Sequence, residues 1–186
     1  MKELSLNILD IAENSVRAKA KNIGIIIVED EETIRMDISD DGCGMTEEFI
    51  ANVTNPFWTT RKTRKVGLGL PLLKMEAEMT GGYVKIKSRH KSEYPLNHGT
   101  VTTALFYKNH IDTTPLGDII ATVVTLIQCN PRIDFLFRHE MLKQTVLLDT
   151  REMREQLGDV PLNNPEVITW IKEYLKEQYA VTEQID

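Results

Sequence analysis

The chain has 186 residues, 41% of them hydrophobic and 27% charged, a balance typical of a folded soluble protein and not of a disordered one. Two cysteines are too few for a disulfide framework or a four-ligand zinc site, and no segment suits a signal peptide or membrane span, so we expect a cytoplasmic protein. The net charge of −6 comes entirely from residues 111–186, with 7 basic and 13 acidic side chains against 15 of each in residues 1–110, which argues against general nucleic-acid binding.

The first part of the chain predicts alternating helices and strands. Helices are expected where apolar residues recur at spacings of three and four, and they cover residues 3–18, a segment beginning near Thr46, and residues 71–79. Strands are expected where apolar and polar residues alternate, over residues 25–29, 33–39, 83–88 and 100–107. Thr46 suits an N-cap, and Pro71 suits the first turn of its helix. This order predicts an α+β fold, a two-layer α/β sandwich.

The pattern changes after residue 109, where we predict a domain boundary. Residues 1–109 would form the sandwich, and residues 110–186 a small acidic C-terminal α+β domain. The elements expected in this second part are helices near residues 116–128, 151 and 165–178, and strands near residues 134–137 and 145–148. An apolar stripe is expected to pack on the main domain and consists of Trp170, Ile171, Tyr174 and Leu175.

The stretch DISDDGCGM, residues 37–45, places two aspartates before Gly42 and Gly44 at the end of a predicted strand. The glycines permit positive φ angles and close approach of a ligand to the backbone. An ionised carboxylate only accepts hydrogen bonds, so in a pocket it would select a donor such as an exocyclic amine. An acidic turn that only reverses the chain has the same pattern.

Two other stretches contain groups suited to metal and phosphate. Asp10 and Asn14 lie four residues apart on one helix face, where the amide would hold Mg²⁺ and the carboxylate would orient a water. In RKTRKVGLGLPLLK, residues 61–74, Gly67 and Gly69 would let amide N–H groups at a helix start face an anion. The alternatives are a solvated helix face and a flexible basic loop.

The stretch HGTVTTALF, residues 98–106, opens a predicted strand with Thr100. The threonine hydroxyl both donates and accepts, so it would share a base with Asp40. An ordinary threonine-rich strand is the alternative for this stretch alone.

Together, the four stretches resemble the boxes of the GHKL family of ATP-binding domains, which includes histidine kinases, type II topoisomerases, MutL-type mismatch-repair proteins, heat-shock chaperones and anti-sigma kinases. The resemblance covers about residues 3–107 and implies the Bergerat-type sandwich with ATP and Mg²⁺ as ligands. The matching stretches are LDIAENSVRAKAKNIGI for the N-box, DDGCGM for the first glycine box, NPFWTTRKTRKVGLGLPLLK for the F-box and second glycine box, and HGTVTTALF for the last box.

The resemblance implies a role for each matching residue. Asn14 would coordinate Mg²⁺ that bridges the phosphates, Asp40 would accept from the adenine amine while Asp41 faces solvent, and Asp10 would be the catalytic base. The remaining nucleotide-binding residues that it implies are Gly42, Gly44 and Thr100 around the base, with Phe57, Arg61, Lys62, Gly67, Leu68, Gly69 and Leu70 in the lid and phosphate loop.

Three departures from the family pattern matter. Hydrolysing members carry a glutamate where Asp10 stands, and the neighbouring acid Glu13 ranks second as a base because it points about 100° away around the helix. Lys65 stands where the second glycine box usually begins with glycine, which would alter phosphate contacts. The lid between residues 56 and 67 is short, as in the smaller kinase-type members.

Three functions fit these observations. The chain would hydrolyse ATP, transfer phosphate to a separate protein, or act as a non-catalytic nucleotide-gated interaction module similar to an anti-sigma regulator. We expect an ATPase or a protein kinase, with ATP or ADP and a protein partner as ligands. No phosphoacceptor can be named, because His139 lies between two predicted strands and His90, His98 and His110 lie at strand ends.

Overall fold

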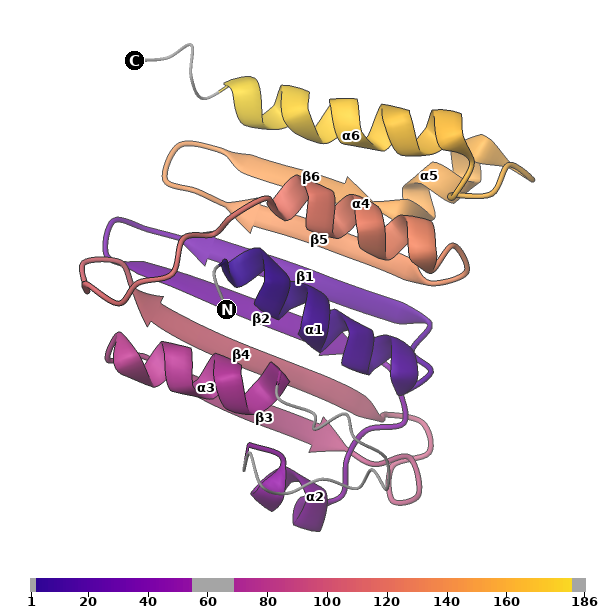
Figure 1. Ribbon diagram of the computed structural model, residues 1–186. Helices are drawn as coiled ribbons and strands as arrows, with labels where there is room; N and C mark the ends of the chain where they lie inside the picture. The colour runs from indigo at the N-terminus through magenta and orange to yellow at the C-terminus, as the bar shows by residue number, and fades with distance from the viewer. Residues whose placement is uncertain (1–2, 55–68, 182–186) are drawn as a thin grey trace.

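The computed structural model describes residues 3–54 and 69–181, which form one six-stranded sheet with helices packed on it (Figure 1). The helices of these residues are α1 (Leu4–Arg17), α2 (Glu47–Asn52), α3 (Gly69–Met79), α4 (Ile119–Cys129), α5 (Thr150–Leu157) and α6 (Pro165–Ala180). The strands are β1 (Asn22–Glu29), β2 (Thr33–Asp40), β3 (Tyr83–Arg89), β4 (Gly99–Tyr107), β5 (Asp134–Glu140) and β6 (Thr145–Asp149). The predicted α+β class is confirmed.

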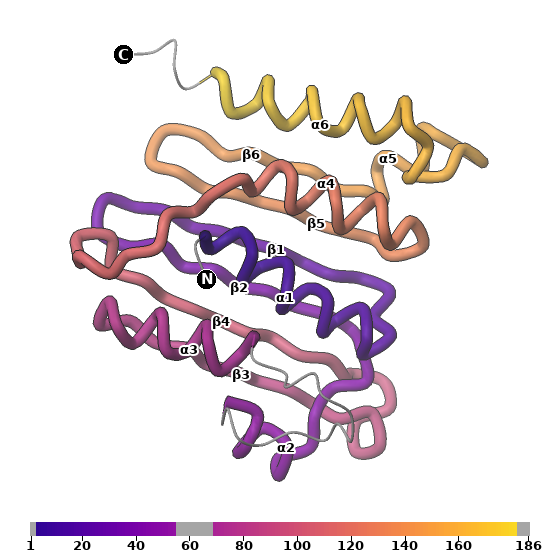
Figure 2. The backbone as a smooth tube through the Cα atoms, in the orientation of Figure 1, coloured from indigo at the N-terminus to yellow at the C-terminus, as the bar shows by residue number. Residues whose placement is uncertain are grey.

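The strand order in the sheet is β3-β4-β2-β1-β5-β6. Neighbouring strands are antiparallel except β1 and β5, which run parallel. Figures 1 and 2 show α1, α3 and α4 lying across one face of the sheet. Alternate strand residues point toward these helices and are buried, as Ile23, Ile25 and Ile27 of β1 are. The sheet and this helix layer enclose the core.

Most predicted elements are confirmed, and several have different ends. Thr46 caps α2 as expected, because its Oγ1 accepts a hydrogen bond from the Phe49 N–H at 3.3 Å. α3 begins at Gly69, two residues before the predicted start. α4 begins three residues later than predicted, at Ile119, because the Asp118 side chain caps it by accepting from the Ala121 N–H at 2.8 Å. β5 extends to Glu140, three residues beyond its predicted end.

The longer β5 corrects the placement of His139, which lies within this strand and not between two strands. The imidazole is 2% exposed, its Nδ1 lies 2.8 Å from the Tyr179 hydroxyl, and its Nε2 lies 3.4 Å from a Glu29 carboxylate oxygen. Both ring nitrogens therefore face protein groups in the interior.

The predicted stripe on α6 is partly buried. Ile171 and Leu175 lie in the core, whereas Trp170 is 51% exposed and stacks on Tyr174 with ring centroids 4.9 Å apart. The helix packs on α4 and β6, which both belong to residues 110–186, and not on the first part of the chain as expected.

The connection between β4 and α4 contains the predicted boundary near residue 110. Beyond it, β5 pairs with β1 and α4 packs on α1, so both parts contribute to one sheet and one helix layer. Independent folding of the two parts stays a prediction. The start of α1 is also tied to this connection, since the N–H groups of Leu4 and Ser5 donate to the carbonyls of Pro115 and Leu116 at 2.9 and 2.8 Å.

Residues 3–54 and 69–181 contain no helix with the length and apolar character needed to span a membrane.

Candidate functional site

The predicted site residues that the structure describes gather at one end of the sheet. β2 ends at Asp40, which lies opposite Thr100 near the start of β4. Paired residues of neighbouring strands direct their side chains to the same sheet face, here the face covered by helices. α1 crosses this face and brings Ser15 against Asp40. Three segments distant in sequence therefore meet at one place.

Both carboxylate oxygens of Asp40 accept a hydrogen bond from the protein. The Ser15 hydroxyl donates to Oδ2 at 2.7 Å, and the Gly42 N–H donates to Oδ1 at 2.9 Å. Ser15 is 3% exposed, while Asp40 is only partly buried. The carboxylate is thus held from the interior.

The glycines after Asp40 allow the chain to pass close to other backbone. A Cβ at Gly42 would lie 2.7 Å from the Ala18 Cβ and 2.9 Å from Asp40 Oδ1. Gly44 has a φ of +68°, and a Cβ there would overlap the carbonyl oxygen of Arg89. His98 holds the same turn, because its Nδ1 lies 2.6 Å from the Gly42 carbonyl oxygen, to which Nδ1–H donates.

Asp41 does more than face solvent. Its carboxylate accepts from the backbone N–H groups of Lys21 and Asn22 at 2.7 and 2.9 Å, and from the Asn22 side chain at 2.8 Å. Burial raises the pKa of Asp41, but these hydrogen bonds together outweigh burial and hold it below its ordinary value. Asp41 therefore fixes the start of β1 beside the end of β2.

Thr100 is bonded to β3 in this structure. Its Oγ1 lies 2.8 Å from the Ser88 hydroxyl, which also lies 2.9 Å from the Gly99 carbonyl and accepts from the Met45 N–H at 2.8 Å. The Ser88 hydroxyl thus joins the starts of β4 and of the segment that leads to α2. The predicted sharing of a base between Thr100 and Asp40 stays a prediction.

The start of α3 lies against α1 at Asp10. A Cβ at Gly69 would be 3.3 Å from the Asp10 Cβ and 3.5 Å from its Oδ2. Asp10 is exposed, and Leu70 is buried at the first turn of α3. The N–H groups in the first turn of a helix lack intrahelical partners and attract anions.

Asn14 lies one helical turn after Asp10 and is exposed. Its Oδ1 accepts from Arg17 Nη1 at 3.1 Å, and the same guanidinium lies 3.9 Å from Glu13 Oε2. Glu13, the second-ranked base, is therefore paired with Arg17 on the flank of α1. The lid and phosphate-loop residues Phe57, Arg61, Lys62, Gly67 and Leu68, with the departure at Lys65, lie outside the described residues.

Sequence reasoning missed Ser15 and His98 as parts of this site. Ser15 continues the spacing of Leu4, Ile8 and Ile11, and a polar residue in that buried row was the available signal. His98 carried no such signal, because its contact with Gly42 joins residues 56 positions apart.

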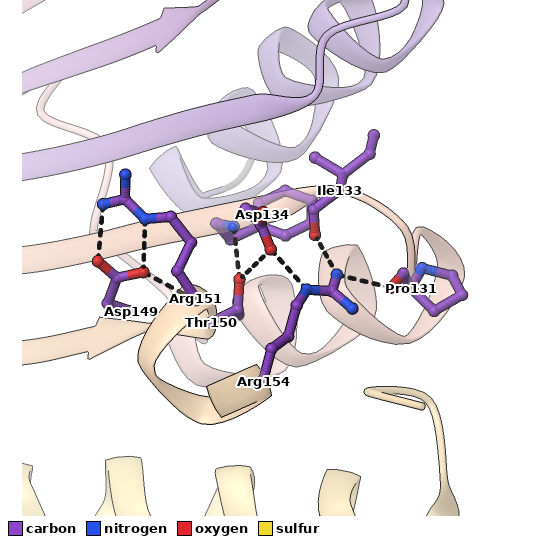
Figure 3. Close-up of polar contacts among 8 residues, drawn as sticks. Pro131, Ile133, Asp134, Asp149, Thr150, Arg151 and Arg154 are labelled. Carbon is purple, nitrogen blue, oxygen red and sulfur yellow. Dashed lines mark hydrogen bonds and ion pairs between the residues drawn. The ribbon is translucent and has the colours of Figure 1, made fainter. Parts of the chain in front are cut away.

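A polar cluster lies where β5 begins and α5 follows β6 (Figure 3). Arg154 donates to Asp134 Oδ1 at 2.6 Å and to the carbonyls of Pro131 and Ile133 at 2.8 and 3.2 Å. The Thr150 hydroxyl accepts from the Phe135 N–H at 2.8 Å. The cluster therefore anchors α5 to the start of β5.

A surface hollow of about 260 Å³ adjoins this cluster, and its lining includes Asp41, Asp134 and Arg151. Each of these charged groups already has a protein partner: Asp41 has Asn22, Asp134 has Arg154, and Arg151 has Asp149 at 2.7 Å. The hollow thus carries charged groups that serve the fold.

The family model for histidine kinase-, DNA gyrase B- and HSP90-like ATPases matches residues 2–110. The chain belongs to this ATPase family. The match confirms the GHKL resemblance of the four stretches, and membership supports ATP binding by this chain. Among curated proteins, no sequence match is found.

Solved structures share the fold of this ATPase. The N-terminal domain of a DNA repair protein matches with a TM-score of 0.57 at 15% identity, covering 80% of this chain and 53% of that chain. The mycobacterial sensor histidine kinase MprB matches with a TM-score of 0.42 at 19% identity, covering 54% and 69% of the two chains. The catalytic domain of histidine kinase ThkA gives 0.42 at 21% identity, with 55% and 65% covered. This chain spans about half the length of the DNA repair domain.

Proposed function

We propose that this chain binds Mg-ATP at the sheet end where α1, β2 and α3 meet, and that it is an ATPase or a protein kinase acting on a separate protein. The observation that carries the proposal is the convergence of Asp40, held by Ser15, with the start of α3 against Asp10. These groups come from the boxes that define the family. They present an acceptor for the base and an anion-attracting helix start on the same side of α1.

Asp40 would read the base. Its carboxylate accepts one hydrogen bond at each oxygen, which leaves further acceptor positions for the adenine amine. Gly42 and Gly44 would shape the pocket wall, because any larger residue would collide with neighbouring backbone. Thr100 would complete the base contacts from the adjacent strand.

The phosphates would lie at the start of α3. Gly69 and Leu70 open this helix, and its first-turn N–H groups favour an anion. Arg61, Lys62, Gly67 and Leu68 would complete the phosphate loop, with Phe57 in the lid. The 11 residues of α3 give the helix a full dipole at this end.

Asn14 fits a role as a magnesium ligand. Its amide oxygen is exposed on α1, and Mg²⁺ prefers oxygen ligands supplied by one or two side chains, phosphates and water. Arg17 donates to this oxygen in the structure, so this hydrogen bond would have to give way. When bound, the ion would neutralise phosphate charge.

Asp10 would act as the base that orients a water or an acceptor hydroxyl. It lies one turn before Asn14 on α1 and against the first residue of α3. A carboxylate here would accept the proton of the attacking group, which is the task of a general base in phosphoryl transfer.

The test is phosphate release from Mg-ATP by the wild-type chain, Asp10→Asn and Glu13→Gln, with ATP affinity measured on each. Glu13→Gln is the matched control, because it removes an exposed carboxylate three residues away on the same helix. Turnover lost in Asp10→Asn alone, with ATP still bound, is the expected result. Loss in Glu13→Gln alone would assign the base to Glu13, and absence of ATP binding in the wild type would contradict the proposal.

The second candidate is a nucleotide-gated interaction module. The observation that favours it is the clamp on α1, whose first N–H groups donate to residues 115 and 116, beyond the predicted boundary. Movement of α1 on nucleotide exchange would reach residues 110–186 through this contact, provided that ATP and ADP prefer different conformations. ATP binding without turnover in every variant, and without phosphate transfer to a co-purified protein, would favour this function.

A further inference from the structure

Ser15 makes an unusual choice of partner for a serine within a helix. A helical serine hydroxyl usually bonds the carbonyl four residues earlier. Here the Ile11 carbonyl lies 3.5 Å from Oγ, whereas Asp40 Oδ2 lies at 2.7 Å. The hydroxyl has a single proton, so the shorter contact takes it. Ser15 therefore spends its donor on a carboxylate 25 residues away in sequence.

Asp40 differs from the adjacent Asp41 in how much acceptor capacity the protein uses. Asp41 accepts three hydrogen bonds, two of them from backbone N–H groups at the start of β1. Asp40 accepts one at each oxygen, from Ser15 and from Gly42. Since a carboxylate offers about four acceptor positions, Asp40 is oriented and still able to bind a donor.

We infer that Ser15 is a positioning residue that makes Asp40 select a 6-amino purine over a 6-oxo purine. This inference rests on the proposed function, in which Asp40 reads the base. An oriented carboxylate accepts from the adenine amine and repels the carbonyl oxygen that hypoxanthine carries at the same position. Without Ser15, one oxygen of Asp40 loses its fixed donor, and orienting the carboxylate then reduces affinity for the amine.

The experiment measures dissociation constants for Mg-ATP and Mg-ITP by calorimetry on the wild type, Ser15→Ala and Ser5→Ala. ITP differs from ATP by a carbonyl in place of the amine. The wild type should prefer ATP, and Ser15→Ala should weaken ATP binding about tenfold while changing ITP binding little, because a hydrogen bond to a charged group is lost. The ratio of the two constants should therefore narrow.

Ser5→Ala is the matched control for this measurement. Ser5 lies on the same helix, is 1% exposed, and donates to a carboxylate oxygen of Glu3 at 3.2 Å, away from Asp40. Its replacement removes a comparable buried hydroxyl. The ATP-to-ITP ratio of Ser5→Ala should equal that of the wild type.

A second variant keeps the test decisive if Ser15→Ala unfolds. Ser15→Cys fills the same space with a weak donor, and thermal unfolding without nucleotide identifies the folded variants. Asp40→Asn supplies an amide that can donate to the ITP carbonyl, so its preference should shift toward ITP.

Several outcomes would overturn the inference. An unchanged ATP-to-ITP ratio in the folded Ser15 variant would do so, and so would equal weakening of both nucleotides, which indicates a purely structural role. A wild type that binds ATP and ITP equally would remove the base-reading role of Asp40. A wild type that binds neither nucleotide would instead contradict the proposed function, and the inference would fall with it.

Discussion

Gly44 combines a positive φ of +68° with no room for a side chain, since a Cβ would overlap the Arg89 carbonyl oxygen. Gly44→Ala should therefore lower the free energy of unfolding by more than about 2 kcal/mol. Gly158 is the matched control, with a φ of +58° and no atom within 4 Å of its Cβ position, so Gly158→Ala should cost only about 1 kcal/mol. Urea unfolding of both variants measures the difference. Equal losses would show that the backbone angle alone matters.

Residue types at the site could be predicted, but their partners could not. The glycine spacing and the two aspartates pointed to the turn after β2, and the family resemblance selected Asp40. The hydrogen bonds that distinguish Asp40 from Asp41 come from Ser15, Lys21 and Asn22, which lie 19 to 25 residues earlier. A local pattern contains no record of contacts formed when α1 folds back across the sheet.

At the level of elements, the outer edge of β6 is closed by a side chain. Gln178 of α6 accepts from the Leu147 N–H and donates to the Leu147 carbonyl, both at 3.0 Å. The amide thus replaces a neighbouring strand. Gln178→Ala should lower the free energy of unfolding by about 1–2 kcal/mol and increase self-association, because the strand edge becomes free to pair. Chemical unfolding and analytical ultracentrifugation measure the two effects, and the exposed neighbour Glu177→Ala should show neither.

The contact between β5 and α6 predicts a pH dependence. Burial lowers the pKa of His139 below its ordinary 6.5, and this effect outweighs the opposing effect of the Glu29 carboxylate, which also pairs with Lys108 at 2.7 Å. In the unfolded chain the imidazole regains its ordinary pKa and binds more protons. The free energy of unfolding should therefore fall as pH decreases from about 6.5 toward the lowered pKa.

Urea unfolding at a series of pH values between 7.5 and 5 checks this slope. In His139→Asn the slope over this range should flatten, because asparagine does not titrate. His90→Asn is the control, since His90 is exposed and bonded to Ser92, and it should keep the wild-type slope. A slope unchanged in His139→Asn would assign the pH dependence to other groups.

The elements themselves were largely predictable, whereas their pairing was not. Apolar spacing located α1 and α6, and alternation located β5 and β6. No feature of β5 indicated that it would pair in parallel with β1, because strand partners are chosen by tertiary contacts between distant segments. The same limit explains α6, whose buried residues were identified correctly while its packing partners were not.

For the whole molecule, the position of β5 extends one sheet across the predicted boundary near residue 110. The structural match to the DNA repair domain covers 80% of this chain, a larger share than residues 1–110 represent, so the shared fold includes part of the second segment. Removing residues 110–186 would expose the β1 edge and free the start of α1, which their connection clamps. These contacts favour unfolding as one unit.

Unfolding of the intact chain tests this expectation against the two-domain prediction. The variant Trp58→Phe leaves Trp170, in α6, as the sole tryptophan, so its fluorescence reports on the C-terminal part. Far-UV circular dichroism reports on helices and strands from both sides of the boundary. Coincident midpoints in urea would indicate one cooperative unit, because loss of β5 and α4 would remove partners of β1 and α1. A fluorescence midpoint separated from the main dichroism transition would support two independently folding domains.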